Sequence, residues 1–364
     1  MLNFLETFIY SFLFLLNKYL SFHFIENLLH RYENTIIKKY VNKKPVIPMK
    51  IPTIDGKDLT NRAFIKLSNN YKNPVLIKGF LKDSPAVEQW NIDYLKNIIG
   101  DFKINTLNKE PKLEIKSCTF NHFANVVEEG NIYINNNHTI LSHFPLLYND
   151  IKSKFKLLIN TLYSTNLRNI HIANLFIGHN NGDKVNGSNM HCGGSGNFFC
   201  MIKGRKRWTL INPKYSSLLK GRVAKSGIHG QTLFDMPDIP LSEYPKIFTY
   251  LPRYDVTLEP GDILWNAPWW WHRIENDAGL SIGLAIRNNK VTKINLLNNF
   301  TYTLSGYTYL VYNTLIIGLY ERLFLKKKEH FGHSKKEDDD SNVLYQIKKL
   351  IEKYPNSLDI DDIN

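Results

Sequence analysis

The feature that most constrains the fold is a series of short apolar segments in the second half of the chain. Segments such as NFFCMIKG, RWTLINP and LSIGLAIRN are rich in β-branched and aromatic residues, which strands prefer. The intervening EPGD, residues 259–262, places Pro and Gly where a type II turn needs them. Many short antiparallel strands joined by tight turns predict a mostly β fold, either a sandwich or a jelly-roll barrel.

The regions around this β-rich part differ from it in composition. Residues 73–81, NPVLIKGFL, predict a buried strand, and residues 84–100 predict a helix that ends at Gly100. The proline-punctuated stretch 43–56 predicts an extended entry into the domain. We therefore expect four regions, which are an apolar helical segment at 1–42, a jelly-roll domain at 43–290, an apolar helix at 291–325 and a charged tail with a short helix at 326–364.

Two apolar segments leave membrane association open. Residues 7–17 carry no charge, but this run is shorter than the roughly 20 residues that span a bilayer. It fits a helix packed on the domain or a helix anchored at a membrane surface. Residues 294–320 are also free of charge and are long enough to span, yet their polar residues and helical spacing favour a docking helix. Region 291–325 is therefore a candidate for homodimer formation as well.

Charge and cysteine content narrow the partners and the compartment. The formal net charge of +13 is scattered over Lys-rich stretches, and no basic helix with base-reading residues accompanies it. We expect no specific nucleic-acid partner. Three cysteines, Cys118, Cys192 and Cys200, are too few and too odd in number for a disulfide framework. An intracellular, reducing compartment fits this content best.

Two histidines lie at the edges of predicted strands. His191 comes just before NFFCMIKG, and His272 follows the tryptophan-rich stretch after the EPGD turn. Neutral imidazole is a good iron ligand, and two histidines with one carboxylate on one face leave coordination positions open. The pair therefore predicts a metal site inside the barrel.

The region from about Val75 to Arg287 resembles the cupin-like, JmjC-related family of iron(II)/2-oxoglutarate oxygenases, in its protein-hydroxylase branch. Three motifs in the family's order carry the resemblance. They are His191 with Asn197, Phe198 and Phe199; then Ile202, Lys203, Gly204 and Lys206; and finally Leu258, Pro260, Gly261, Asp262, Leu264, Pro268, Trp270, Trp271 and His272.

The resemblance implies a double-stranded β-helix core with flanking helices and a set of residue roles. His191 and His272 are the implied iron(II) ligands, and Lys206 is the implied partner of the distal carboxylate of 2-oxoglutarate. Asn197 and Ser188 fall where the family places polar contacts to the cosubstrate or to waters at the iron site. The implied activity is hydroxylation, with a side chain of a polypeptide as the first candidate for the substrate.

The chain departs from the family at the third metal ligand. The family motif is His-x-Asp/Glu, and here Gly193 stands two residues after His191. Cys192 faces the other side of a regular strand, and Asp183 is the nearest carboxylate in the preceding loop. Three interpretations stay open: an oxygenase completed by water or by a loop carboxylate, an oxygenase that binds a halide in the gap, as iron halogenases do, and a catalytically inactive binding module.

Overall fold

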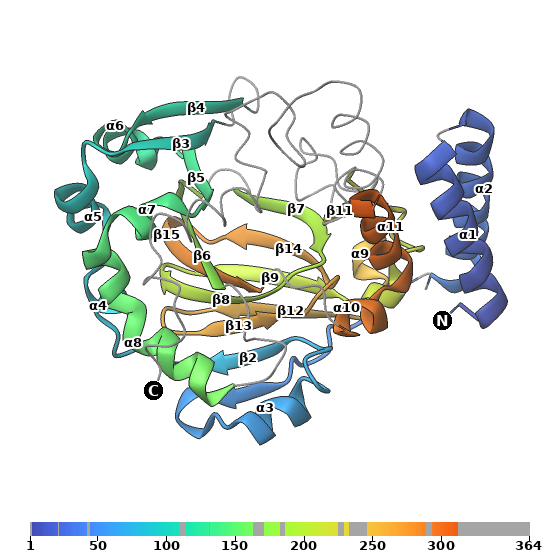
Figure 1. The fold of residues 1–364 in the computed structure, drawn as a ribbon, viewed down its shortest axis with the longest axis horizontal. Helices are drawn as coiled ribbons and strands as arrows, with labels where there is room; N and C mark the ends of the chain where they lie inside the picture. The colour runs from blue at the N-terminus through green and yellow to red at the C-terminus, as the bar shows by residue number, and fades with distance from the viewer. Residues whose placement is uncertain are drawn as a thin grey trace.

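The computed structural model describes residues 2–20, 22–41, 44–108, 114–130, 132–162, 171–182, 186–224, 229–232, 246–288 and 293–311. Two facing β-sheets form its centre, with helices at both ends of the sheets (Figure 1). Asp183, the tail at 326–364 and the last part of the expected helix at 291–325 lie outside the described residues.

The larger sheet has nine strands in the order β1-β2-β13-β8-β15-β6-β5-β3-β4. Their bounds are β1 (Thr53–Asp55), β2 (Val75–Lys78), β3 (Lys103–Asn108), β4 (Glu114–Thr119), β5 (Ile132–Asn137), β6 (His171–Asn180), β8 (Gly196–Lys203), β13 (Ile263–Asn266) and β15 (Gly279–Asn288). The smaller sheet has six strands in the order β10-β11-β7-β14-β9-β12. Their bounds are β7 (Asn186–Gly193), β9 (Lys206–Ile211), β10 (Gly221–Val223), β11 (His229–Thr232), β12 (Arg253–Leu258) and β14 (Trp271–Asn276).

From β6 to β9 and again from β12 to β15, strands that follow one another in the chain alternate between the two sheets, as in a jelly roll. β7, β9 and β14 lie in the smaller sheet, whereas β8, β13 and β15 lie in the larger one, and every pairing among these strands is antiparallel. Aromatic residues fill much of the space between the sheets, with Phe199 against Trp208 at 5.0 Å between ring centroids. The mostly β, jelly-roll fold predicted from the sequence is confirmed.

The EPGD segment forms the tight turn between β12 and β13. Gly261 has a φ of +94°, which a residue with a side chain rarely adopts. The buried carboxylate of Asp262 accepts hydrogen bonds from the backbone N–H groups of Gly79, at 2.9 Å, and Glu259, at 3.1 Å. These bonds tie the turn to the end of β2 and fix the start of β13, the strand that leads to His272.

Helices pack into the core of the larger sheet, most of them along one side of the two sheets, with α3 beside β2 (Figure 1). They are α3 (Asn61–Leu67), α4 (Pro85–Gln89), α5 (Ile92–Ile99), α6 (Phe120–Val126), α7 (Thr139–His143) and α8 (Pro145–Thr161), with 3-10 turns at Gly56–Asp58, Val127–Glu129 and Pro213–Tyr215. The predicted end of a helix at Gly100 is confirmed, but the prediction of one helix over 84–100 is wrong, because the segment divides into α4 and α5. Asn91 caps the second helix through its side chain, which accepts from the Tyr94 N–H at 2.8 Å, and the Trp90 indole donates to Asp150 at 2.8 Å.

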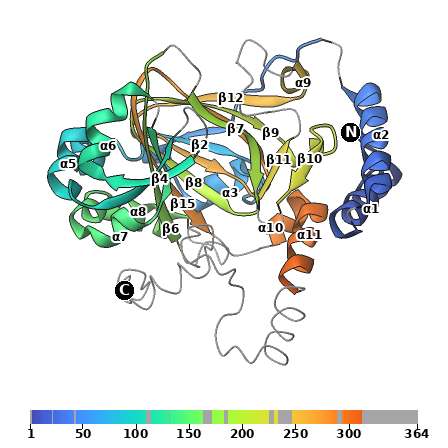
Figure 2. The ribbon, with the colours of Figure 1, turned by 90° about the horizontal axis from the view of Figure 1, so that it is seen from above.

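The other end of the structure holds the terminal helices α1 (Phe4–Leu20), α2 (His23–Tyr40), α10 (Lys293–Asn298) and α11 (Phe300–Val311), with the short α9 (Lys246–Thr249) nearby (Figure 2). Phe14 of α1 stacks on Tyr302 of α11, with ring centroids 5.1 Å apart. Arg222 donates two hydrogen bonds to the fully buried Glu33 of α2, at 2.7 and 3.0 Å. The terminal helices thus share a second hydrophobic cluster with the outer face of the smaller sheet.

One side of α1 faces solvent with large aromatic residues. Phe4, Phe8 and Phe12 are 88, 60 and 54% exposed, while Tyr10 and Phe14 on the opposite side are buried. None of the helices among the described residues is long and apolar enough to cross a membrane. Contact of α1 with a membrane surface stays a prediction.

We expect Arg222→Ala to lower the free energy of unfolding by about 3 kcal/mol, because it leaves the buried Glu33 carboxylate without its ion-pair partner. Urea denaturation checks this. Asp83→Asn, in the exposed ion pair with Lys154, is the matched control and should change the same quantity by less than about 1 kcal/mol. Equal effects of the two substitutions would contradict a stabilising role of the buried pair.

Candidate metal and cosubstrate site

The two candidate metal ligands lie side by side on adjacent strands of the smaller sheet. β7 pairs with β14 so that His191 lies directly opposite His272. Their ring centroids are 4.1 Å apart and their planes are inclined by 54°. Trp208 of β9 stacks on His272 at 5.5 Å and holds its ring from one side. Both imidazoles therefore lie on the inner face of the sheet.

Backbone hydrogen bonds set the tautomer of both rings. Nδ1 of His191 lies 2.7 Å from the Asn189 carbonyl oxygen, and Nδ1 of His272 lies 2.8 Å from the Trp270 carbonyl oxygen. A carbonyl oxygen can only accept, so each Nδ1 carries the proton and each Nε2 keeps its lone pair. A metal-bound histidine is oriented in the same way.

The surroundings keep these histidines neutral. Burial lowers the pKa of His191, and Arg287 and His229 add smaller effects through their positive charges. Burial lowers the pKa of His272 well below its usual value, and the charges of His191 and Arg287 contribute in the same direction. Neutral imidazole is the form that binds a metal.

Lys206 lies at the other end of the same interior. It is 1% exposed, and its ammonium donates to the amide oxygen of Asn276 and to the Ser281 hydroxyl, the latter at 3.2 Å. It also lies 5.8 Å from the centre of the Tyr133 ring. The neighbouring Arg207, in contrast, is exposed and pairs with Asp277 at 2.9 Å. Lys206 is thus the inward-facing cation of a basic stretch.

Asn197 and Ser188 also reach the interior. Asn197 on β8 lies opposite Asn266 on β13, whose side chain contacts His272. Ser188 is three residues before His191, so a regular strand would turn it outward. A register shift between β7 and β14 instead places Ser188 opposite Ile274, which shares the inner face with His272.

Several buried polar atoms in this interior have no hydrogen-bond partner among the described residues. They are Ser188 Oγ, Asn197 Oδ1, Trp208 Nε1, Asn266 Oδ1 and Asn276 Nδ2. Buried polar groups are nearly always hydrogen-bonded, so these five atoms make the interior a candidate site for a polar ligand.

Arg287 is an interior residue that the sequence did not reveal. It lies opposite Asn197 in the pairing of β15 with β8, and no ion-pair partner lies beside it among the described residues. Burial lowers the pKa of Arg287 to about 10, so it stays charged at neutral pH. With Lys206, the interior holds two cations, which favours an anionic ligand.

The third ligand position is not filled in the family's way. Gly193 has no side chain, and Cys192 packs on the outer face in the second hydrophobic cluster. Burial raises the pKa of the Cys192 thiol, which opposes its use as a thiolate ligand. Across the described ranges, no three His, Cys, Asp or Glu side chains are grouped closely enough to hold a metal. The residues of the interior suit an anionic cosubstrate, and they supply two of the three protein ligands that the family motif provides for iron.

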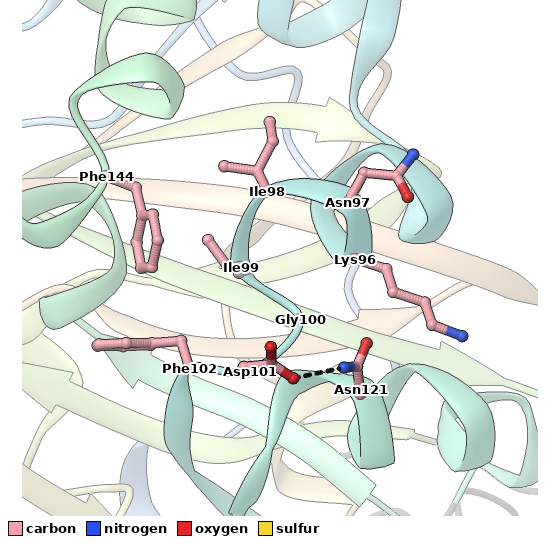
Figure 3. Close-up of a pocket in the computed structure, with 9 residues that line it drawn as sticks. All are labelled: Lys96, Asn97, Ile98, Ile99, Gly100, Asp101, Phe102, Asn121 and Phe144. Atoms are coloured by element: carbon pink, nitrogen blue, oxygen red, sulfur yellow. Dashed lines mark hydrogen bonds between the residues drawn. The ribbon is translucent and has the colours of Figure 1, made fainter.

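A pocket elsewhere does not belong to this site. It has a volume of about 380 Å³ and lies where α5 ends and β3 begins (Figure 3). It is lined by Lys96, Asn97, Ile98, Ile99, Gly100, Asp101, Phe102, Asn121 and Phe144. It contains none of the residues of the barrel interior.

A jelly roll with histidines and polar groups on its inner face belongs to the cupin class of barrels. Residues 62–287 match the model of the cupin-like domain family, and the chain belongs to that family. The family membership predicted from the three motifs is confirmed.

Three relatives show how far the similarity extends. JmjC domain-containing protein A of Dictyostelium discoideum is 24% identical over 248 residues, which cover 63% of this chain and 92% of the relative. JmjC domain-containing protein D of the same organism is 25% identical over 268 residues, 69% of this chain and 58% of the relative. The tRNA wybutosine-synthesizing protein 5 of Gallus gallus is 22% identical over 253 residues, 62% of this chain and 73% of the relative.

Stability should decrease as the pH falls from about 7 to 5. The pKa values of His191 and His272 are lowered in the folded state, so below the unfolded value of about 6.5 the unfolded chain binds more protons. Each histidine contributes a slope of at most about 1.4 kcal/mol per pH unit. Urea denaturation between pH 7.5 and 5 measures it. His272→Gln should flatten the dependence and His143→Gln, at an exposed position, should leave it unchanged; the reverse result would contradict the neutral, buried pair.

Proposed function

We propose that the protein is an iron(II)- and 2-oxoglutarate-dependent oxygenase that hydroxylates a side chain of a polypeptide. The observation that carries the proposal is the arrangement of one barrel interior. Two neutral imidazoles present their Nε2 lone pairs at one end, and a buried lysine lies at the other. This arrangement suits a metal and a dicarboxylate that bridges from it to the lysine.

His191 and His272 hold iron(II) through their Nε2 atoms in this proposal. Bound iron(II) would supply oxygen activation coupled to the oxidative decarboxylation of 2-oxoglutarate to succinate and CO₂, which is the chemistry that hydroxylates a C–H bond. Trp208 keeps the His272 ring in place, and Phe199 packs against Trp208 on the inner side. Both rings belong to the apolar lining of the interior.

Lys206 binds the distal carboxylate of 2-oxoglutarate. Asn276 and Ser281 already hold its ammonium in position, so little side-chain freedom is lost when the cosubstrate binds. Asn197 and Ser188 satisfy their unpaired polar atoms on the cosubstrate or on waters beside it. Arg287 adds positive charge near the histidines, which stabilises the second carboxylate.

The substrate class rests on the protein-hydroxylase character of the motifs. Of the relatives described above, one is named a tRNA wybutosine-synthesizing protein, and the other two names give no substrate. A polypeptide remains the proposal for this chain, and a tRNA is the alternative to include in a substrate search.

A second candidate function is a catalytically inactive cupin-like module that binds a ligand or a partner. Gly193 favours it, because a site with two protein ligands binds metal more weakly than a site with three. The polar atoms without hydrogen-bond partners and the two cations of the interior, Lys206 and Arg287, fit an anionic ligand with or without a metal. Metal binding therefore separates the two functions.

The test is an anaerobic titration of the full chain with iron(II) and 2-oxoglutarate, followed by the visible charge-transfer band of iron-bound 2-oxoglutarate. We expect a band in the wild-type protein that His191→Ala and Lys206→Ala abolish, because each removes a direct contact. Lys203→Ala, which removes an exposed lysine at the end of β8, is the matched control and should keep the band.

No band in the wild-type protein would contradict the oxygenase proposal. The variant Gly193→Asp then distinguishes between a barrel that has lost its metal and a barrel in which these residues never formed a metal site. A band in that variant alone identifies an oxygenase barrel that has lost its metal and serves as a binding module. A band in neither protein shows that these residues do not form a metal site.

A further inference from the structure

The position left empty by Gly193 has a histidine beside it on the neighbouring strand. β11 pairs with the end of β7, and in this pairing His229 lies directly opposite Gly193. One pair further along, Gln231 lies directly opposite His191. Residues that face each other in an antiparallel pair have their Cβ atoms about 5 Å apart and on the same side of the sheet.

The alternation of buried and exposed residues along β11 also places His229 on the inner face of the sheet. Gly230 and Thr232 are buried, whereas His229 and Gln231 are exposed. A Cβ added to Gly230 would lie 3.1 Å from the sulfur of Cys192, so Gly230 faces the outer hydrophobic cluster. His229 consequently lies on the opposite, inner side, on the same face as His191.

The positive charge of His229 also influences the pKa of His191. After burial, which has the largest effect, the positive charges of Arg287 and His229 lower the pKa of His191. This small effect is consistent with the strand pairing, which places His229 and His191 on the same face of the sheet. His191 in turn contacts His272.

We propose that His229 is the third protein ligand of the metal, so that His191, His229 and His272 form a three-histidine site. An imidazole is longer than the carboxyl group of an aspartate, so a ligand from the adjacent strand can reach the space above Gly193. Gly193 itself has no side chain to occupy that space. The inference rests on the proposed function for the metal itself and adds the identity of the third ligand.

The site assembles when metal binds. Within the part of the chain that the structure describes, the three rings are not grouped as metal ligands, and His229 is exposed. An exposed side chain changes rotamer freely, and coordination offsets the lost rotamer entropy. Three neutral imidazoles leave the metal with its full double positive charge, whereas a carboxylate would cancel part of it. Such a metal attracts anionic ligands more strongly, and three histidines also suit zinc.

Cobalt(II) binding to the full chain, without 2-oxoglutarate or substrate, tests the inference. The affinity is measured by calorimetry, and the visible cobalt spectrum reports the ligand set. We expect His229→Ala to weaken cobalt binding by about 10- to 100-fold and to change the spectrum. His143→Ala, at an exposed histidine outside the barrel, is the control and should change neither. The double variant Gly193→Asp/His229→Ala should recover the affinity, because the carboxylate then occupies the third position.

The outcomes separate this inference from the proposed function. If His191→Ala abolishes cobalt binding while His229→Ala matches the wild-type protein, the third-ligand inference is wrong and the two-histidine metal site stands. If the wild-type protein binds no cobalt, both the inference and the metal-dependent function are overturned. Thermal unfolding of each variant shows whether lost binding reflects lost folding.

Discussion

The site depends on the register between β7 and β14. This pairing sets His191 opposite His272, and both side chains face the inside of the barrel. Because side chains alternate along a strand, a slip of one residue would turn one imidazole to the outer face, where Cys192 now packs. Just before β14, the Trp269 N–H donates to the carbonyl oxygen of Gly193 at 2.6 Å, which continues the pairing with β7 beyond the two histidines.

The second property that defines the interior, after the placement of the histidines, is its positive charge. Lys206 and Arg287 bring two cations into a space lined by aromatic rings and neutral amides, and both histidines are neutral there. Two positive charges in such a space favour the entry of an anion. In the proposed function, Lys206 would hold a dicarboxylate at one end of the interior, and the two histidines would hold the metal at the other.

Much of this arrangement was predictable from the sequence. The alternating segments and the EPGD turn predicted the barrel, and the motifs around His191, Lys206 and His272 predicted the family. The break at Asn91 was missed because the apolar spacing before and after it suits one continuous helix, and only the cap of Asn91 divides it.

The remaining site residues depend on cross-strand neighbours, which a sequence does not display. The pairing of Arg287 with Asn197 brings Arg287 to the site, and the pairing of His229 with Gly193 brings His229 there. Ser188 was named from the family motif, but its inward position needs the bulge in β7, which strict alternation would not predict. Asp183 lies outside the described residues, so its candidacy as a ligand stays a prediction.

The most direct measurement of the central claim is a crystal structure of the protein with manganese(II), a redox-quiet substitute for iron, and 2-oxoglutarate. The account predicts the metal at the Nε2 atoms of His191 and His272 and one carboxylate of 2-oxoglutarate at Lys206. Metal bound away from these histidines, or a barrel interior that holds neither ligand at saturating concentrations, would contradict it.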